Sequence, residues 1–280
     1  MFTVLEREEL NPTVTKLVID APLIAKKAKA GQFVIIRSHE LGERMPLTIA
    51  DYNREKGSVT IIFQIVGRST KILNELKVGD KILDFVGPLG VASHIEGLKR
   101  VCVVGGGVGC AIAYPTAKAL HAQGSDVTVI AGFRNKDLLI LEDEFRAASN
   151  NMYIMSDDGS VGDKGLVTHK LEELLKSGEE FDEVIAIGPL IMMKFVCEVT
   201  KKYNVKTMVS MNPIMIDGTG MCGCCRLSVA GEMKFACVDG PDFDGHEVDF
   251  DEAMVRSRQY APFEEATREK DCNLFDKEVS

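Results

Sequence analysis

Residues 101–109 read Val-Cys-Val-Val-Gly-Gly-Gly-Val-Gly, an apolar run that ends in a cluster of glycines. A helical stretch follows, to about Gln123. A strand, a glycine turn and a helix in this order are typical of a nucleotide-binding domain, because the turn lets a phosphate approach the backbone closely. The stretch is not a regular G-x-G-x-x-G, since Cys110 occupies the last glycine position. Taken alone, it is equally compatible with a turn that only packs the helix on a sheet.

Downstream of this turn the chain continues the same pattern of strand, turn and helix. Predicted strands alternate with predicted helices, which favours βαβ units around a parallel sheet. The acidic residue that ordinarily follows the second strand is missing, and Gly132-Phe133-Arg134 stands in its place. We expect strands at residues 127–131, 153–155 and 183–187, and helices at residues 142–149 and 167–176.

The first hundred residues have a different pattern. Short runs of β-branched and aromatic residues alternate with Gly, Pro, Asn and Asp, and many short strands in this length predict a small antiparallel barrel. One helix is expected near Ser69, because Ile72, Leu73 and Leu76 then share a face. The strands are expected at residues 2–7, 14–20, 33–37, 47–51, 59–66 and 81–85.

Two short motifs in the barrel are suited to phosphate. The first, Arg44-Met-Pro46-Leu47-Thr48, combines an arginine that can bind a pyrophosphate in bidentate fashion with a threonine able to reach a flavin ring edge. The second, Gly67-Arg-Ser69-Thr70, precedes a helix whose N-terminus favours anions. Each motif is weak alone, because Arg44 can be a surface charge and Ser69 an ordinary N-cap. Their joint presence upstream of a βα domain is more specific.

The strongest chemical signal is a cluster of cysteines. Cys222, Cys225 and Cys237 follow Asp217 with the spacing D-x4-C-x2-C-x11-C. Plant-type [2Fe–2S] sites have C-x4-C-x2-C and a distant fourth cysteine, so Asp217 occupies the first ligand position. Neighbouring glycines allow the tight turns that wrap backbone around a cluster.

Two other interpretations of the cysteines stay open. Cys224 rather than Asp217 can be the fourth ligand, although adjacent cysteines rarely both reach one [2Fe–2S] core. A structural zinc site is the second alternative, and it lacks a matching second Cys/His pair apart from His246. The cysteines Cys102, Cys110, Cys197 and Cys272 are expected to have no metal role, the first three as small buried side chains.

Composition excludes several classes of protein. The chain has 280 residues and a formal net charge of -9, which argues against a nucleic-acid-binding surface. The N-terminus has no signal-peptide pattern, and no apolar run is long enough to span a bilayer. We therefore expect a cytoplasmic protein that binds neither nucleic acid nor membrane. Eight cysteines, four of them clustered, point to metal ligation rather than disulfides.

Together these residues resemble the ferredoxin–NADP reductase superfamily. Arg44, Pro46, Leu47 and Thr48 loosely match its flavin motif R-x-[YPF]-[SLY]-[ST], and Gly188-Pro189 matches a turn that lies near the nicotinamide. The resemblance implies a β-barrel plus α/β fold: an antiparallel FAD-binding barrel, a parallel-sheet nucleotide-binding domain and a small C-terminal iron–sulfur segment.

The cysteine segment narrows the resemblance. A reductase module followed by a [2Fe–2S] segment is similar to the electron-transfer subunits of dihydroorotate dehydrogenases, which have cysteine in the first ligand position. Asp217, the stretch 157–160 and the charged tail are more similar to the family of small subunits of NADH-dependent reduced ferredoxin:NADP oxidoreductases, also called sulfide dehydrogenase subunits.

This resemblance implies roles for individual residues. FAD is expected against the barrel with Thr48 near flavin N5, and hydride passes between NAD(H), as substrate, and the flavin. The expected FAD-binding residues are Arg44, Pro46, Leu47, Thr48, Gly67, Ser69 and Thr70. The expected NAD(H)-binding residues are Gly106, Gly107, Gly109, Arg134, Asp157, Gly188 and Pro189. The expected cluster ligands are Asp217, Cys222, Cys225 and Cys237.

The same resemblance implies a heterodimer. The partner is expected to be a larger subunit with its own FAD and [4Fe–4S] clusters, because this chain lacks the cysteines for a [4Fe–4S] set, and ferredoxin is reached only through that partner.

The predicted boundaries are 1–97 for the barrel, 98–210 for the nucleotide domain, 211–250 for the cluster segment and 251–280 for the charged tail. The competing hypotheses are a dihydroorotate- or sulfide-dehydrogenase subunit, a hydrogenase-linked subunit, a stand-alone reductase and a zinc-stapled nucleotide-binding sensor.

Overall fold

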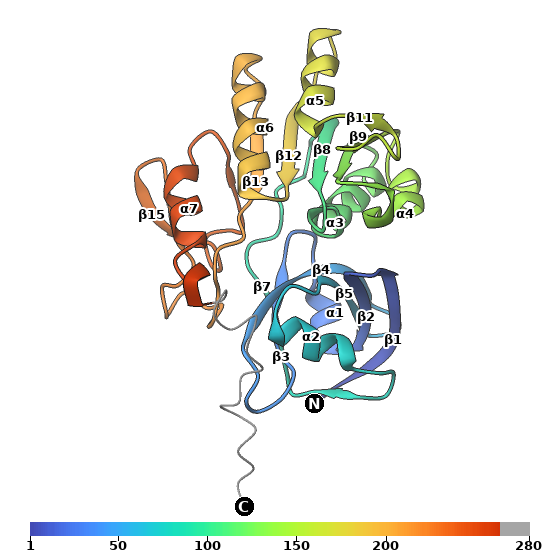
Figure 1. Cartoon of the computed structure of the whole chain (residues 1–280), viewed down its shortest axis with the longest axis vertical. Coiled ribbons are helices and arrows are strands. Elements are labelled where there is room, and N and C mark those ends of the chain that lie inside the picture. The colour runs from blue at the N-terminus through green and yellow to red at the C-terminus, as the bar shows by residue number, and fades with distance from the viewer. Residues whose placement is uncertain (264–280) are drawn as a thin grey trace, which may run out of the picture.

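The structure, a computed structural model, describes residues 1–263. Its N-terminal part is an antiparallel sheet in the order β6-β1-β2-β5-β4-β3-β7. The edge strands β6 and β7 are separated in sequence only by Leu83, so the sheet curls into a nearly closed barrel (Figure 1). The elements are β1 (Phe2–Asn11), β2 (Val14–Asp20), α1 (Pro22–Lys27), β3 (Phe33–Arg37), β4 (Met45–Asn53), β5 (Ser58–Gln64), α2 (Arg68–Glu75), β6 (Lys81–Ile82) and β7 (Asp84–Leu89).

The second part is a parallel sheet covered by helices. The strand order is β11-β10-β9-β8-β12-β13-β16, and only β16 runs antiparallel to its neighbour. The elements are β8 (Arg100–Gly106), α3 (Gly109–Ala122), β9 (Asp126–Phe133), the 3-10 helix η1 (Lys136–Leu138), α4 (Glu142–Ala147), β10 (Asn151–Ser156), β11 (Asp163–Lys164), α5 (Val167–Lys176), β12 (Glu183–Ile187), α6 (Leu190–Lys202), β13 (Thr207–Ser210) and β16 (Asp242–Asp244).

Strand β8 explains why its sequence is a continuous apolar run. Val101 and Val103 belong to the core under α3 and α4, whereas Cys102 and Val104 belong to the core under α5 and α6. Both faces of a parallel sheet are covered by helices, so alternate residues are equally buried and the run does not alternate with polar residues.

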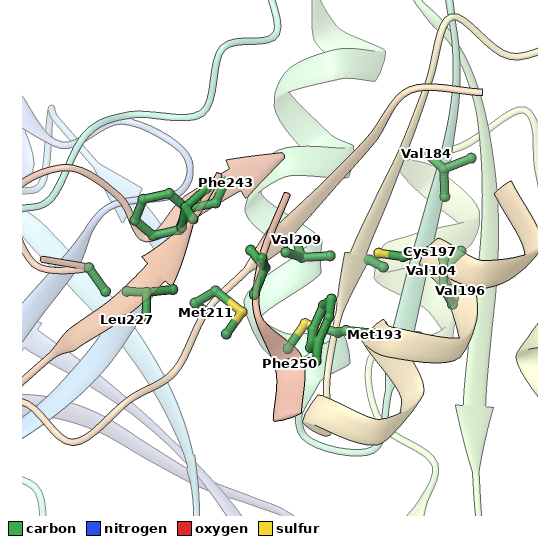
Figure 2. Packing of buried hydrophobic residues seen from close by; sticks show 14 of the residues in the cluster. Val104, Val184, Met193, Val196, Cys197, Val209, Met211, Leu227, Phe243 and Phe250 are labelled. Atoms are coloured by element: carbon green, nitrogen blue, oxygen red, sulfur yellow. The ribbon is translucent and has the colours of Figure 1, made fainter. Parts of the chain in front are cut away.

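The C-terminal segment folds back onto the edge of this sheet. It contains the hairpin β14 (Arg226–Val229) and β15 (Glu232–Phe235), then β16, which pairs with β13, and finally α7 (Phe250–Ser257). Figure 2 shows side chains from the sheet, such as Val104 and Val209, and side chains from this segment, namely Leu227, Phe243 and Phe250, in one continuous core. The cysteine segment is therefore built into the second domain's core.

The predicted fold class is confirmed. The predicted barrel strands and the strand–helix alternation are present, although the predicted strand 81–85 is divided at Leu83 into β6 and the start of β7. The elements that were not predicted include α1, β11, α6, β13, β16 and the β14–β15 hairpin. Cys102, Cys110 and Cys197 are buried as expected, and burial raises the pKa of Cys110 and of Cys197 to about 12. Within residues 1–263 no helix combines the length and the apolar character needed to cross a membrane. Cys272 and the end of the predicted tail lie outside the described residues.

Candidate functional site

A large cavity separates the barrel from the carboxyl ends of the parallel strands. Its volume is about 1180 Å³, above the 300–1,000 Å³ of ordinary small-molecule pockets, which leaves room for more than one nucleotide. Ligands of open α/β sheets bind at this edge of the sheet. The predicted site residues that line the cavity are Pro46, Leu47, Thr48, Thr70, Gly106, Gly107, Gly109, Arg134, Asp157, Gly188 and Pro189.

The glycine turn after β8 lies where the strand order reverses. β8 pairs with β9 on one side and with β12 on the other, so the turns after β8 and β12 open a crevice between their two helices. A Cβ on Gly109 would lie 2.5 Å from the Ile187 carbonyl oxygen, and one on Gly188 would lie 3.2 Å from the Gly106 backbone. Close packing of the two turns therefore requires Gly109 and Gly188, in addition to any contact with a nucleotide.

Gly107 has a different reason to be glycine. Its φ is +56°, in the left-handed region, and a Cβ there would meet no atom within 4 Å. Its N–H donates to the Gly132 carbonyl at 2.8 Å, which holds the turn against the end of β9. The cavity wall at Gly107 is consequently bare backbone, as a phosphate site requires.

Arg134 and Asp157 lie at the ends of β9 and β10, which are the first and second strands on one side of β8. Arg134 follows β9 and Asp157 follows β10, and the Asp157 N–H donates to the Phe133 carbonyl at 3.2 Å. Both line the cavity on the side away from Gly188-Pro189. The end of β9 thus carries a cation and the end of β10 an anion.

Strand β4 forms the barrel wall of the cavity. Pro46, Leu47 and Thr48 line it, and Thr48 pairs with Phe33 of β3, which also lines it. Thr70 lines the cavity from α2, but its hydroxyl oxygen accepts the N–H groups of Val66 and Gly67, both at 3.0 Å. Thr70, not Ser69, is therefore the residue whose side chain caps α2.

The three other predicted flavin residues lie outside the cavity lining. Gly67 is the N-cap residue of α2, and the Ser69 hydroxyl donates to the Glu43 carboxylate. Arg44 donates from Nε to the Ile216 carbonyl at 2.7 Å, so its guanidinium contacts the cysteine segment.

Sequence reasoning missed several residues that line the cavity. They come from barrel strands β3 and β5, from α5, from the whole length of α6, and from the end of β13 with the loop after it. Residues such as Ile191 and Asn212 have a signal in their position just after the carboxyl end of a strand, whereas Glu198 and Lys202, far along α6, have none. The missed residues include Phe33, Phe63, Gln64, His169, Ile191, Met192, Phe195, Glu198, Lys202, Ser210, Asn212 and Met215.

Cys222, Cys224 and Cys225 lie in the loop between β13 and β14, and Cys237 follows β15 at the other end of the hairpin. Cys225 and Cys237 are buried with their Sγ atoms 3.2 Å apart, whereas Cys222 is exposed. Backbone N–H groups, of Cys224 first and then of Asp217, lower the pKa of Cys222. Burial raises the pKa of Cys237 to about 12. Cys224 is half-buried, and its carbonyl accepts a hydrogen bond from Arg256 of α7 at 3.3 Å.

Asp217 lies half-buried in this loop. One of its oxygens, Oδ2, accepts the Thr219 hydroxyl at 2.5 Å and the N–H groups of Thr219 and Met221 at 3.0 and 3.2 Å. These bonds, the Thr219 hydroxyl first, lower the pKa of Asp217. The other oxygen, Oδ1, is the one available to a metal, so Asp217 can shape the loop and serve as a ligand at once.

Two contacts link the predicted ligand residues, one between thiols and one through a backbone N–H. Cys225 lies against Cys237, and the Asp217 N–H faces Cys222. Within residues 1–263 no group of three Cys, His, Asp or Glu side chains is arranged so that it could hold a metal ion.

Comparison with protein families matches two regions of the chain. Residues 103–198 match the oxidoreductase NAD-binding domain, and residues 212–249 match the iron–sulfur cluster binding domain of dihydroorotate dehydrogenase B. The second match covers all four predicted ligands.

Two relatives extend over nearly the whole chain. A Thermotoga maritima protein, named as a homolog of the electron transfer subunit of dihydroorotate dehydrogenase B (NAD(+)), is 47% identical over 95% of this chain and 94% of its own length. The chain belongs to this family. A Clostridium beijerinckii protein, "Uncharacterized protein in adh 3'region", is 52% identical over 93% of this chain and 90% of its own length.

Among solved structures, a chain of NADH-dependent reduced ferredoxin-NADP oxidoreductase, reported for flavin-based electron bifurcation, is 46% identical with a TM-score of 0.91. It matches over 96% of this chain and 97% of its own length. Ferredoxin-NADP+ reductase from Plasmodium falciparum shares the fold alone, at 17% identity and a TM-score of 0.60 over 74% of this chain and 94% of its own. The chain is thus a subunit of an NAD(P)H-linked flavin oxidoreductase with a ferredoxin–NADP reductase-like fold and an iron–sulfur binding domain.

Proposed function

We propose that the chain is the FAD- and [2Fe–2S]-carrying subunit of a bifurcating ferredoxin:NADP oxidoreductase, where it exchanges hydride with NAD(H) and single electrons with a partner subunit. The observation that carries this proposal is the position of the cavity, between the barrel and the carboxyl ends of the strands, beside a cysteine loop that rests on the same barrel. The 46% identity to a bifurcating oxidoreductase chain supports it.

The cavity walls fit the two nucleotides. Pro46, Leu47 and Thr48 would hold a flavin against β4, and the bare backbone at Gly107 would admit the pyrophosphate of NAD(H). When bound, flavin and nicotinamide supply hydride exchange, and flavin together with an iron–sulfur cluster converts it into single-electron steps. Because Gly188 is part of the tight contact between the two turns, Pro189 would hold the nicotinamide end of the nucleotide in a fixed position.

The residues that would hold the cluster in this proposal are Asp217, Cys222, Cys225 and Cys237. One observation supports it: the Cys225 and Cys237 sulfurs lie 3.2 Å apart. The Cys224 thiol lies beside Cys222, with Sγ 4.0 Å from the Cys222 carbonyl oxygen, so the variant Cys224→Ser decides between Asp217 and Cys224 as the fourth ligand. A carboxylate is a harder ligand than a thiolate, so Asp217 would give its iron a different potential from that of an all-cysteine cluster.

The partner in this proposal is a larger oxidoreductase subunit with its own FAD and [4Fe–4S] clusters. Relatives named as electron transfer subunits imply a partner of some kind. If the partner instead oxidises dihydroorotate or sulfide, the chemistry of this chain is unchanged. Purification of the complex from its native cells, followed by assays with NADPH and ferredoxin and with dihydroorotate, separates these possibilities.

The first experiment is an anaerobic absorption and EPR spectrum of the purified chain, with flavin and iron counted. The proposal expects one FAD, two irons and the EPR signal of a reduced [2Fe–2S] cluster. A colourless protein that contains zinc would contradict the proposal and favour the sensor hypothesis.

The matched pair of variants is Cys225→Ser and Cys224→Ser. C225S should lose the cluster signal and keep NADH-dependent reduction of an artificial dye, because the cavity is intact. C224S should keep both. Equal loss of FAD in C225S would contradict the division of labour between cavity and cysteine loop.

A further inference from the structure

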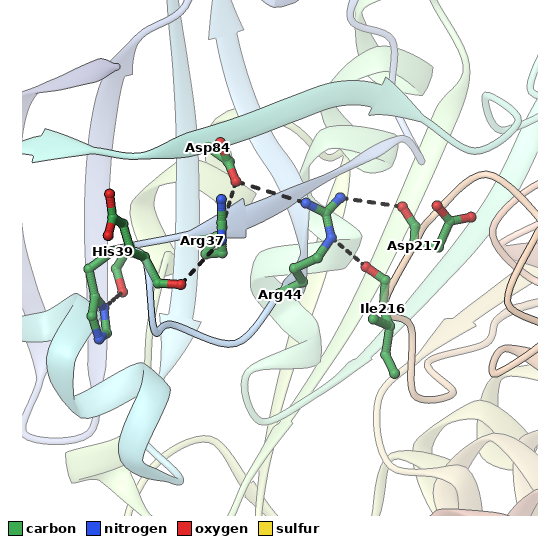
Figure 3. A network of polar contacts seen from close by, with 8 residues as sticks. Arg37, His39, Arg44, Asp84, Ile216 and Asp217 are labelled. Atoms are coloured by element: carbon green, nitrogen blue, oxygen red, sulfur yellow. Dashed lines mark hydrogen bonds and ion pairs between the residues drawn. The ribbon is translucent and has the colours of Figure 1, made fainter. Parts of the chain in front are cut away.

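Arg44 connects the barrel to the cysteine loop. Besides the 2.7 Å bond from Nε to the Ile216 carbonyl, its Nη2 donates to the Asp217 carbonyl at 3.5 Å. Figure 3 shows the guanidinium between these two carbonyls and the carboxylate of Asp84. One face of Arg44 therefore binds the backbone of the residue predicted as a cluster ligand.

On its other side the Arg44 guanidinium faces the carboxylate of Asp84, which is itself held by a second arginine. Asp84 of β7 lies 4.0 Å from Arg44 Nη1 and is held at 2.6 Å by Nε of Arg37, on β3. These side chains are about one-third exposed. Arg37 orients the Asp84 carboxylate, and this carboxylate faces Arg44. Residues of the barrel therefore fix the orientation of the Arg44 side chain.

A separate contact shows that the loop rests on the barrel at this point. Gly218, next to Asp217, has a φ of +84°, and a Cβ there would lie 2.9 Å from Ile35 Cγ1 and 2.9 Å from Leu89 Cδ1. Ile35 of β3 also belongs to the same core as Cys225 and Cys237. The loop thus approaches β3 and β7 too closely for any side chain at position 218, whether or not Arg44 is present.

We infer that Arg44 is a positioning residue, which holds the Asp217 end of the iron–sulfur loop against the flavin barrel. It immediately precedes β4, whose residues Pro46, Leu47 and Thr48 line the cavity. The Cα atoms of Arg44 and Thr48 are at most about 13 Å apart in an extended strand. The short segment 44–48 therefore connects the part of the cavity wall that is proposed to hold flavin to Asp217, the proposed cluster ligand. Arg44 fixes the spacing between the two.

This inference rests on the proposed cluster and changes the role expected for Arg44, whose guanidinium does not line the cavity. A planar fork can bind two adjacent carbonyls, whereas a lysine ammonium at the same place makes a single point contact. Groups that orient metal ligands commonly alter metal affinity about 10–100-fold when they are removed.

The test uses the full-length holoprotein with Arg44→Ala, Arg44→Lys and the control Arg54→Ala. Arg54 follows the other end of β4, carries the same charge and also donates to a backbone carbonyl, that of Ala28, at 3.0 Å. The readouts are FAD per chain, the EPR spectrum of the reduced cluster and the rate of iron release to a chelator.

We expect R44A to keep FAD, to shift the EPR spectrum and to release iron about ten-fold faster or more. R44K should lie between R44A and wild type, and R54A should match wild type. An R44A protein that loses FAD but keeps an unchanged EPR spectrum would show that Arg44 binds the flavin phosphates. This result would overturn the inference. An R44K protein identical to wild type in spectrum and iron release overturns it as well, even if R44A fails to fold. A wild-type chain without iron would overturn the proposed function together with the inference.

Discussion

Asp217 has two roles in this proposal, one in the hydrogen bonds of the loop and one as a ligand of iron. A single substitution can remove one role and keep the other. Its Oδ2 accepts three hydrogen bonds from the loop, and its Oδ1 is the atom proposed for iron. Asp217→Asn keeps an acceptor oxygen for the loop and removes the anionic ligand, so we expect partial loss of iron with a folded chain. Asp217→Cys should keep two irons and shift the EPR spectrum toward that of an all-cysteine cluster.

Iron analysis and EPR of both variants check this prediction. If D217N keeps the wild-type spectrum while Cys224→Ser loses the cluster, Cys224 is the fourth ligand instead.

Asp242 gives a prediction about pH. The Ser93 hydroxyl donates to its Oδ2 at 2.5 Å, while Oδ1 is enclosed and has no hydrogen-bond partner among residues 1–263. Burial raises the pKa of Asp242, and the hydroxyls of Ser93 and Ser210 and the charge of His94 offset part of that rise. Compared with the unfolded chain, the folded protein therefore favours the protonated form of the Asp242 carboxyl.

A raised pKa in the folded state stabilises the protein fully below the unfolded pKa, and this contribution is lost as pH rises through the folded pKa. Asp242→Asn cannot ionise. The stability of wild type minus that of D242N should consequently fall as pH rises from about 4 to 8. Chemical unfolding of both proteins across this range measures the difference, and two parallel stability curves would refute the argument.

At the scale of elements, the glycine turn after β8 is limited by packing. A methyl group on Gly109 would lie 2.5 Å from the Ile187 oxygen and 2.7 Å from Gly188 Cα, both backbone atoms that cannot rotate away. We expect Gly109→Ala to destabilise the protein by about 1–3 kcal/mol and to raise the KM for NADH, because it pushes the two turns apart.

The control for stability is Gly67→Ala, where a Cβ meets nothing within 4 Å and φ is -152°. Its cost should stay below about 1 kcal/mol. Thermal unfolding and steady-state dye reduction measure both variants. A G109A protein with wild-type stability would show that the turns can separate without strain.

Elements with a local pattern could be predicted, and elements that depend on distant partners could not. The alternation of apolar runs with glycine turns is enough to predict β8, β9 and β12. Strand β16 contains two aspartates in three residues and has no strand pattern, so only its pairing with β13 makes it a strand. Arg44 lies before β4, outside the alternation of the strand, and sequence alone therefore does not give the direction of its side chain.

For the whole molecule, the predicted boundary at residue 210 would cut through a core. Phe243 and Phe250 are at least 93% buried, and they belong to the same core as Val104, Val209 and Met193 of the nucleotide domain (Figure 2). Loss of a buried Phe side chain costs about 3–5 kcal/mol, and a whole domain is stable by only about 5–15 kcal/mol.

We therefore expect a fragment of residues 1–210 to aggregate or to unfold at a much lower temperature than the full chain, with loss of NADH-dependent dye reduction. The full-length C225S variant, which lacks the cluster but keeps Phe243 and Phe250, should retain both fold and activity. This comparison separates the loss of iron from the loss of packing. A soluble fragment with the thermal midpoint and dye activity of C225S would mean that the cysteine segment is an independent appendage rather than a wall of the nucleotide domain.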